Sequence, residues 1–276
     1  MFQVEPELRL DVKRRFDWRV FFILWAASIL ATIAVIPYTL TLESGILANA
    51  NLPMPLPLLI GIQIGETAIL LAVAVALGYG LATRIGIGLP FIEKWLQGTP
   101  IWNRLPRTVL FAAVLGLIGG ALIVVLDAVF FAPQMAALLG ANANPPTVNP
   151  PAWQGFLASF YGGITEEVLL RLFVLTLLAW LGHFVSRDAE GRPTVGILWI
   201  ANIITAVLFG LGHLPATAAI GIPLTPMIIT RAILLNGLVG VIAGWLYWTR
   251  GLESAMISHF AADMILHVLL PLISPH

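Results

Sequence analysis

Long apolar segments alternate with short polar segments along this chain. Residues 20–42 contain no Asp, Glu, Lys or Arg, and a helix of this length crosses a hydrocarbon core of ~30 Å. Further apolar segments of similar character cover residues 57–83, 108–132, 153–185, 194–214, 227–249 and 254–273. The pattern predicts an all-α, polytopic transmembrane helical bundle of about seven spans.

Polar or irregular segments connect these spans. Residues 1–19 carry mixed charge and are interpreted as a solvated, helical lead-in at the membrane surface. Residues 91–96 are a candidate short interfacial helix, and residues 133–151 form an uncharged Pro/Asn-rich loop. Residues 215–226 contain Pro and Gly, so we expect them to be buried in protein or to line a cavity. An eighth, partial span within this last segment is an alternative.

The composition supports a membrane protein and excludes several chemistries. Of the 276 residues, 59% are hydrophobic and 10% are charged, whereas charged residues make up about 25% of soluble domains. The chain has no cysteine, which excludes disulfides, thiolate catalysis and cysteine-ligated metals. No basic patch suggests nucleic acid as a partner. We interpret residues 1–276 as a single integral membrane domain.

The distribution of cations predicts the orientation in the cell membrane. Of the fourteen Lys and Arg residues, five lie in residues 1–19, four in the connection 84–107, two near residue 190 and one at Arg250. These connections alternate along the chain, so the positive-inside rule predicts a cytoplasmic N-terminus and an external C-terminus. The two remaining cations, Arg171 and Arg231, lie within predicted spans.

Residues 165–173 place three charges inside the predicted span 153–185. A charge at the bilayer centre costs at least about 2.5 kcal/mol on insertion scales, so these side chains are expected to be paired or functional. Glu167 and Arg171 are four residues apart and share a helix face, which predicts an ion pair. Glu166 is rotated by about 100° from Glu167 and faces other surroundings. The spacing predicts one structural carboxylate and one available carboxylate.

Two further pairs of polar or aromatic residues have helical spacing. Phe209 and His213 share one face of the span 194–214, and His259 and Asp263 share one face of the span 254–273. A lone intramembrane His is usually a hydrogen-bonded packing residue. The combination of a free Glu, two His and an Asp on three spans instead favours chemistry.

The other intramembrane charges favour structure over catalysis. Glu66, Asp127 and Arg231 lie within predicted spans, and we expect Arg231 to pair with one of the two acids. His183 and His267 lie near predicted helix ends, where we expect them only to pack or to meet water.

The three motifs together resemble those of a known family. Glu-Glu-x-x-x-Arg at 166–171, Phe-x-x-x-His at 209–213 and His-x-x-x-Asp at 259–263 occur in this order. They are similar to the motifs of the CAAX protease and bacteriocin-processing (Abi) family of intramembrane endopeptidases. The resemblance covers about residues 150–265, whereas the first 130 residues match only as generic spans.

The resemblance implies a role for each motif residue. Glu166 would be the catalytic glutamate that activates a water together with His213. Glu167 and Arg171 would be the accompanying pair that shapes the helix and the site.

His259 and Asp263 would be the groups that stabilise the oxyanion. Prenyl-processing members commonly carry Asn where this chain has Asp263. An ionised carboxylate accepts hydrogen bonds but does not donate them, so Asp263 is expected to be protonated, to orient His259 or to ligate a metal.

Two mechanisms fit these residues. A carboxylate in apolar surroundings is a stronger base than in water, which suits proton removal from a water molecule. Zinc is the alternative, with His213, His259 and either Glu166 or Asp263 as ligands. The chain lacks a His-Glu-x-x-His helix, so we favour the metal-free glutamate mechanism and expect no cofactor.

The expected substrate is a membrane-associated or lipid-modified peptide, in the resembling family a CAAX-like prenylated C-terminus. A leader or bacteriocin-type peptide is the alternative in a cell without prenylated proteins. Two other functions compete: a proton- or ion-coupled transporter, because buried acids and His also mark ion pathways, and a non-catalytic membrane scaffold. The sequence does not specify the oligomeric state.

Counting residues gives an apparent conflict in depth. Glu166 and His213 lie 23 and 24 residues from Ala189, so two antiparallel helices would bring them to a similar depth. His259 is nine residues past Arg250, which places it only about 13 Å deep in a straight helix. Helix tilt or a helix break is expected to close this gap.

Overall fold

The computed structural model describes residues 8–48, 50–99, 101–139 and 150–273, and these residues fold into helices without β-strands. Six helices are long and apolar enough to cross a membrane: Trp18–Leu42, Leu56–Ile85, Leu105–Ala137, Val195–Ala219, Pro226–Arg250 and Leu252–Ile273. The prediction of an all-helical polytopic bundle is therefore confirmed. The protein is a multi-pass membrane protein.

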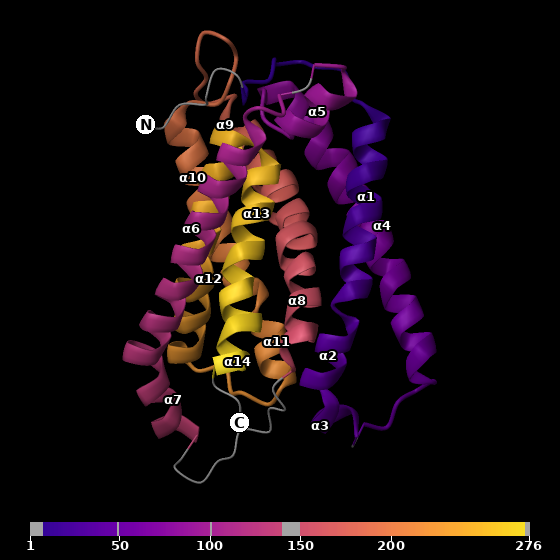
Figure 1. Ribbon diagram of the computed structural model, residues 1–276, viewed down its shortest axis with the longest axis vertical. Coiled ribbons are helices and arrows are strands. Elements are labelled where there is room, and N and C mark those ends of the chain that lie inside the picture. Colours follow the sequence, from indigo (N-terminus) through magenta and orange to yellow (C-terminus); the bar gives the residue numbers. More distant parts are fainter. Residues whose placement is uncertain (1–7, 49, 100, 140–149, 274–276) are drawn as a thin grey trace.

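The elements follow one another along the chain without long excursions (Figure 1). The first part contains α1 (Trp18–Ala34), α2 (Ile36–Leu42), α3 (Ser44–Leu47), α4 (Leu56–Ile85), α5 (Pro90–Leu96), α6 (Leu105–Leu126), η2 (Asp127–Phe131) and α7 (Ala132–Leu139). The second part contains α8 (Ala152–Phe160), η3 (Tyr161–Glu166), η4 (Val168–Leu175), α9 (Thr176–Gly182), α10 (Val195–Gly212), α11 (Leu214–Ala219), α12 (Pro226–Arg250), α13 (Leu252–Asp263), η5 (Met264–Leu269) and α14 (Leu270–Ile273). The predicted interfacial helix at residues 91–96 is α5.

The predicted span 153–185 is one continuous helical run from α8 to α9, but it is not one of the six apolar helices. It contains the three charges of the central motif, and the wide π-helical turns of η3 and η4 lie on either side of Glu167. A π-helical turn rotates the following side chains relative to an α-helix and is frequent at functional sites. The run packs against α1, α4, α10 and α13.

Small residues allow the motif-bearing helices to approach closely. A Cβ on Gly116 of α6 would lie 2.0 Å from the carbonyl oxygen of Ser258 on α13, and a Cβ on Gly155 of α8 would lie 1.8 Å from that of His267. Neither position has room for a side chain. These contacts hold α13 between α6 and α8, so that His259 and Asp263 face the α8–α9 run (Figure 1).

The connecting segments differ from the predictions in three places. The lead-in is not helical between residues 9 and 17, and Leu8 and Leu10 are buried, because its polar groups bond to the bundle: Arg14 Nε donates to Glu93 Oε2 at 2.9 Å. Within the predicted loop 133–151, residues up to 139 form α7, and residues 140–149 lie outside the described part. None of the residues 215–226 is buried, because α11 satisfies its own backbone hydrogen bonds. This segment contains no further span.

Candidate active site

Glu167 and Arg171 form the buried ion pair that their spacing predicts. Arg171 NH1 lies 2.9 Å from Glu167 Oε1, and both side chains are inaccessible to solvent. Arg171 NH2 donates to the carbonyl oxygen of Gly240 on α12 at 3.0 Å, and its guanidinium lies 4.9 Å from the ring centre of Phe209. Arg171 therefore connects η4 to α12 and α10.

His259 joins this pair to the other carboxylates. Its Nδ1 lies 2.7 Å from Glu167 Oε1, and because a carboxylate only accepts, Nδ1 carries the hydrogen. Its Nε2 lies 3.7 Å from both Glu166 Oε2 and Asp263 Oδ1. One edge of the imidazole is thus fixed by the structural ion pair, and the other edge faces the two remaining acids.

The two adjacent glutamates have different surroundings. The Glu167 side chain is fully buried, whereas 22% of the Glu166 side chain is accessible. Glu166 is also more accessible than His259 at 6% or Asp263 at 11%. The prediction of one structural and one available carboxylate is confirmed by these environments.

His213 lies at the C-terminal end of α10 and reaches the cluster through Phe209. Its Nδ1 donates to the carbonyl oxygen of Phe209 at 2.8 Å, and the two rings meet edge to face with centres 4.8 Å apart. The Phe209 ring lies in turn 5.4 Å from the ring of His259. His213 makes no direct hydrogen bond or ion pair with Glu166, so any joint action of the two requires a molecule between them.

The cluster extends further than the motifs indicate. His267 Nε2 lies 3.9 Å from Asp263 Oδ1, and the hydroxyl of Tyr38 on α2 lies 3.1 Å from His267 Nδ1. The prediction that His267 only packs or meets water is wrong. The signal was the repeat of four-residue steps from His259 to Asp263 to His267, whereas nothing in the sequence pointed to Tyr38.

The conflict in depth disappears because the reference points were unequal. The hairpin that contains Ala189 extends beyond the ends of α9 and α10 (Figure 1), so counting from it overstated the depth of Glu166. The junction between α12 and α13 is covered by the segment before α5, since Leu252 N donates to the carbonyl oxygen of Gly88. His259 therefore starts deeper than its distance from Arg250 suggests.

Gly162 is a site residue that sequence reasoning missed. A Cβ at this position would lie 2.2 Å from Asp263 Oδ2 and 3.1 Å from His259 Nε2. We expect Gly162→Ala to displace Asp263 and to lower kcat by more than tenfold, since misplacing catalytic groups by about 1 Å costs up to 10²-fold. The measurement is kcat in wild type and variant. Gly61→Ala is the matched control because a Cβ there meets nothing within 4 Å, and equal rates for all three proteins would contradict the expectation.

The remaining intramembrane charges lie apart from this cluster. Arg231 on α12 donates twice to Asp127, at 2.6 and 2.7 Å, which confirms the predicted structural pair. Glu66 is exposed on α4. Among the residues that the structure describes, no group of three or more His, Asp or Glu side chains is arranged to hold a metal ion.

An all-helical membrane protein with a glutamate, an aspartate and histidines gathered between its helices has the architecture of an intramembrane protease. The family model described as Type II CAAX prenyl endopeptidase Rce1-like matches residues 148–265, the region that contains all three motifs. This region therefore belongs to the CAAX endopeptidases that the motifs resemble, and the protein is an intramembrane protease. The search of curated proteins and the search of solved structures gave no match.

Proposed function

We propose that the protein hydrolyses a peptide bond of a membrane-associated substrate, with Glu166 as the general base. The observation that carries the proposal is the accessible Glu166 carboxylate 3.7 Å from an imidazole nitrogen whose other edge is fixed by a buried ion pair. A general base needs a water molecule within hydrogen-bond distance and an orienting neighbour. Of the two glutamates, Glu166 has both access and an unpaired oxygen.

The proposed reaction uses only side chains of the cluster. Glu166 removes a proton from a water molecule while the water oxygen attacks the peptide carbonyl carbon, which gives a tetrahedral intermediate with a negative oxygen. Glu166 then returns the proton to the leaving nitrogen, and the C–N bond breaks. Because His213 donates through Nδ1, its Nε2 offers a lone pair that can accept a hydrogen bond from the same water.

His259 and Asp263 are assigned to the negative oxygen of the intermediate. Nε2 of His259 faces only carboxylate oxygens, so a proton between these groups removes the repulsion of opposed lone pairs. With that proton on Nε2, His259 donates to the oxyanion. Asp263 then acts by holding the proton on His259, and His267 with Tyr38 positions Asp263.

Two replacements of Asp263 separate this assignment from a purely structural role. We expect Asp263→Ala to lower kcat about 10²- to 10³-fold, as removal of an oxyanion stabiliser does. We expect Asp263→Asn to keep kcat within about tenfold of wild type, because the amide donates to the oxyanion itself. The measurement is kcat across a pH series. An Asn variant as inactive as the Ala variant would contradict the assignment.

The proposed substrate is a prenylated protein C-terminus of the CAAX type. The family match supports this class, and the position of the cluster between apolar helices requires a substrate that enters from the membrane. The test compares cleavage of one CAAX peptide with and without its prenyl group by purified protein in lipid nanodiscs, with Glu66→Gln as a control that should cleave normally. A prenyl preference of tenfold or more is expected at the level of kcat/KM, since a buried CH₂ is worth about 0.8 kcal/mol. Equal cleavage of both peptides would overturn the substrate class and leave the protease assignment standing.

A further inference from the structure

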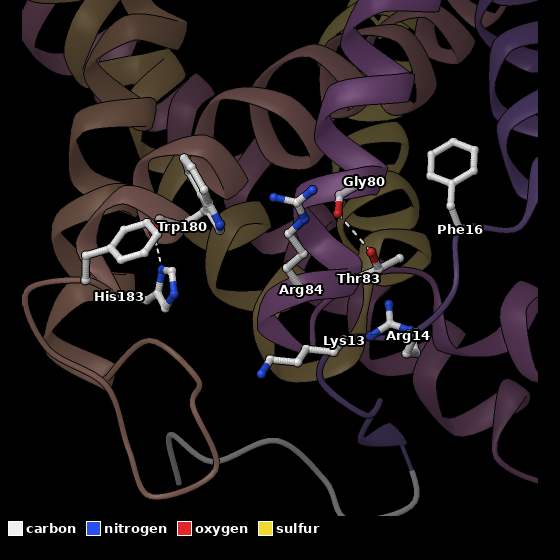
Figure 2. A pocket seen from close by; sticks show the side chains of 9 residues that line it. Lys13, Arg14, Phe16, Gly80, Thr83, Arg84, Trp180 and His183 are labelled. Atoms are coloured by element: carbon white, nitrogen blue, oxygen red, sulfur yellow. Dashed lines mark hydrogen bonds between the residues drawn. The ribbon is translucent and has the colours of Figure 1, made fainter.

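A cavity of about 580 Å³ lies at the end of the bundle where α4 and α9 finish and α1 begins (Figure 2). Its lining comes from the lead-in, from the last turns of α4 and from the end of α9: Lys13, Arg14, Phe16, Gly80, Thr83, Arg84, Trp180, His183 and Phe184. None of these residues belongs to the three motifs. The cavity is therefore separate from the candidate active site.

The charges that line this cavity are all positive. Lys13, Arg14 and Arg84 contribute to the lining, and no acidic residue does. Arg14 is already paired with Glu93. Lys13 and Arg84 are exposed, and no described residue forms a hydrogen bond or an ion pair with either side chain. The cavity thus presents two uncompensated cations.

The neighbouring cavity makes the contrast clear. It measures about 440 Å³ and also contains Arg14 and Phe16, but Asp11 and Asp17 contribute to its lining. Mixed charge does not select for an anion. Only the larger cavity combines free cations with an absence of lining acids.

Aromatic rings bound the cationic cavity on two sides. Trp180 and Phe184 meet edge to face with ring centres 5.1 Å apart, and Phe16 lies on the other side, 5.0 Å from the ring of Tyr79. In Figure 2, Arg84 projects from α4 between the Trp180 side and the Phe16 side. Aromatic rings beside cations at the ends of spans are typical of the depth of lipid headgroups.

We propose that this cavity binds the phosphate of an anionic phospholipid headgroup. Lys13 and Arg84 supply the charge, and the aromatic rings contact the glycerol and the first carbons of the acyl chains. The cavity lies on the side that carries the loop cations, predicted to be cytoplasmic, where anionic lipids are concentrated. A soluble phosphate ester shares the phosphate chemistry and is the alternative source that the experiment separates.

The experiment measures lipid binding to the purified full-length protein by native mass spectrometry. Phosphatidylglycerol is compared with phosphatidylcholine for wild type, Lys13→Gln, Arg84→Gln and the double variant. Each charge near a lipid headgroup contributes about 1 kcal/mol, so each single variant should bind phosphatidylglycerol about fivefold more weakly and the double variant about 25-fold. The matched control is Arg107→Gln, an exposed cation outside the cavity, which should bind as wild type does.

The outcomes separate the proposal from its alternatives. A preference for phosphatidylglycerol that is lost in the double variant and kept in the control supports a lipid site. Equal losses in the double variant and the control would overturn it in favour of unspecific attraction, and equal binding of both lipids would overturn it directly. Glycerol 3-phosphate forms the last arm: binding as tight as that of the lipid would assign the cavity to a soluble ester instead. Since Lys13 and Arg84 are exposed, each single variant carries the test should the double variant fold poorly.

Discussion

Replacing Glu166 with glutamine is expected to lower kcat about 10²- to 10⁴-fold, the range that general-base catalysis contributes. Glutamine has nearly the shape of glutamate but does not take up a proton near neutral pH, so the variant removes the base and retains the packing. The side chain is partly accessible and has no close ion-pair partner shorter than 3.7 Å, so little stability depends on its charge. The measurement is single-turnover cleavage of a prenylated peptide by purified protein.

The same experiment needs a matched control at another membrane acid. Glu66→Gln makes the same chemical change at an exposed position of α4 away from the motifs, and it should cleave at the wild-type rate. Unchanged melting temperatures in all three proteins would show that the fold is intact. If Glu166→Gln kept wild-type kcat, Glu166 would not be the base.

Replacing Arg171 with methionine is expected to destabilise the fold by about 3–5 kcal/mol, because it leaves a buried charge without its partner. Glu167 is inaccessible to solvent and would lose its only cation. The variant also removes the hydrogen bond to Gly240 and the contact with Phe209, which connect η4 to two neighbouring helices. The measurement is the melting temperature or the unfolding midpoint in detergent.

A double variant shows whether the loss arises from the isolated charge. Glu167→Gln together with Arg171→Met removes both charges, and replacing a buried ion pair by neutral residues is often close to neutral in stability. We expect the double variant to regain most of the stability but to cleave slowly, because glutamine fixes His259 less firmly than a carboxylate does. Arg107→Met is the exposed control and should change stability by less than about 0.5 kcal/mol. A single Arg171 variant as stable as wild type would contradict the structural role of the pair.

The sequence was informative where the signal is local. Apolar length predicts the spans, and the four-residue step from Glu167 to Arg171 predicts an ion pair that depends only on helix geometry. The separation of the two glutamates into a buried and an accessible one follows from the same geometry. The pairing of Arg231 with an acid was also predictable, because an unpaired charge in a span is costly.

Contacts between distant segments were not predictable in the same way. Tyr38 reaches His267 only because α2 packs beside α8 in the folded bundle, and Gly162 matters only because Asp263 lies opposite it. The lead-in looked like a solvated helix by its charges, yet Leu8 and Leu10 are buried and Arg14 pairs with Glu93. The partners of these residues are far away in sequence, so neither periodicity nor composition indicates them.

The most direct test of the central claim is the initial rate of prenylated-peptide cleavage by wild-type protein, measured with and without a zinc chelator. The claim is that Glu166, and not a bound metal, activates the water molecule. The account predicts an unchanged rate after chelation, with the rate of Glu166→Gln as the baseline. Loss of cleavage on chelation and its recovery on adding zinc would contradict the account and would make His213 and His259 metal ligands.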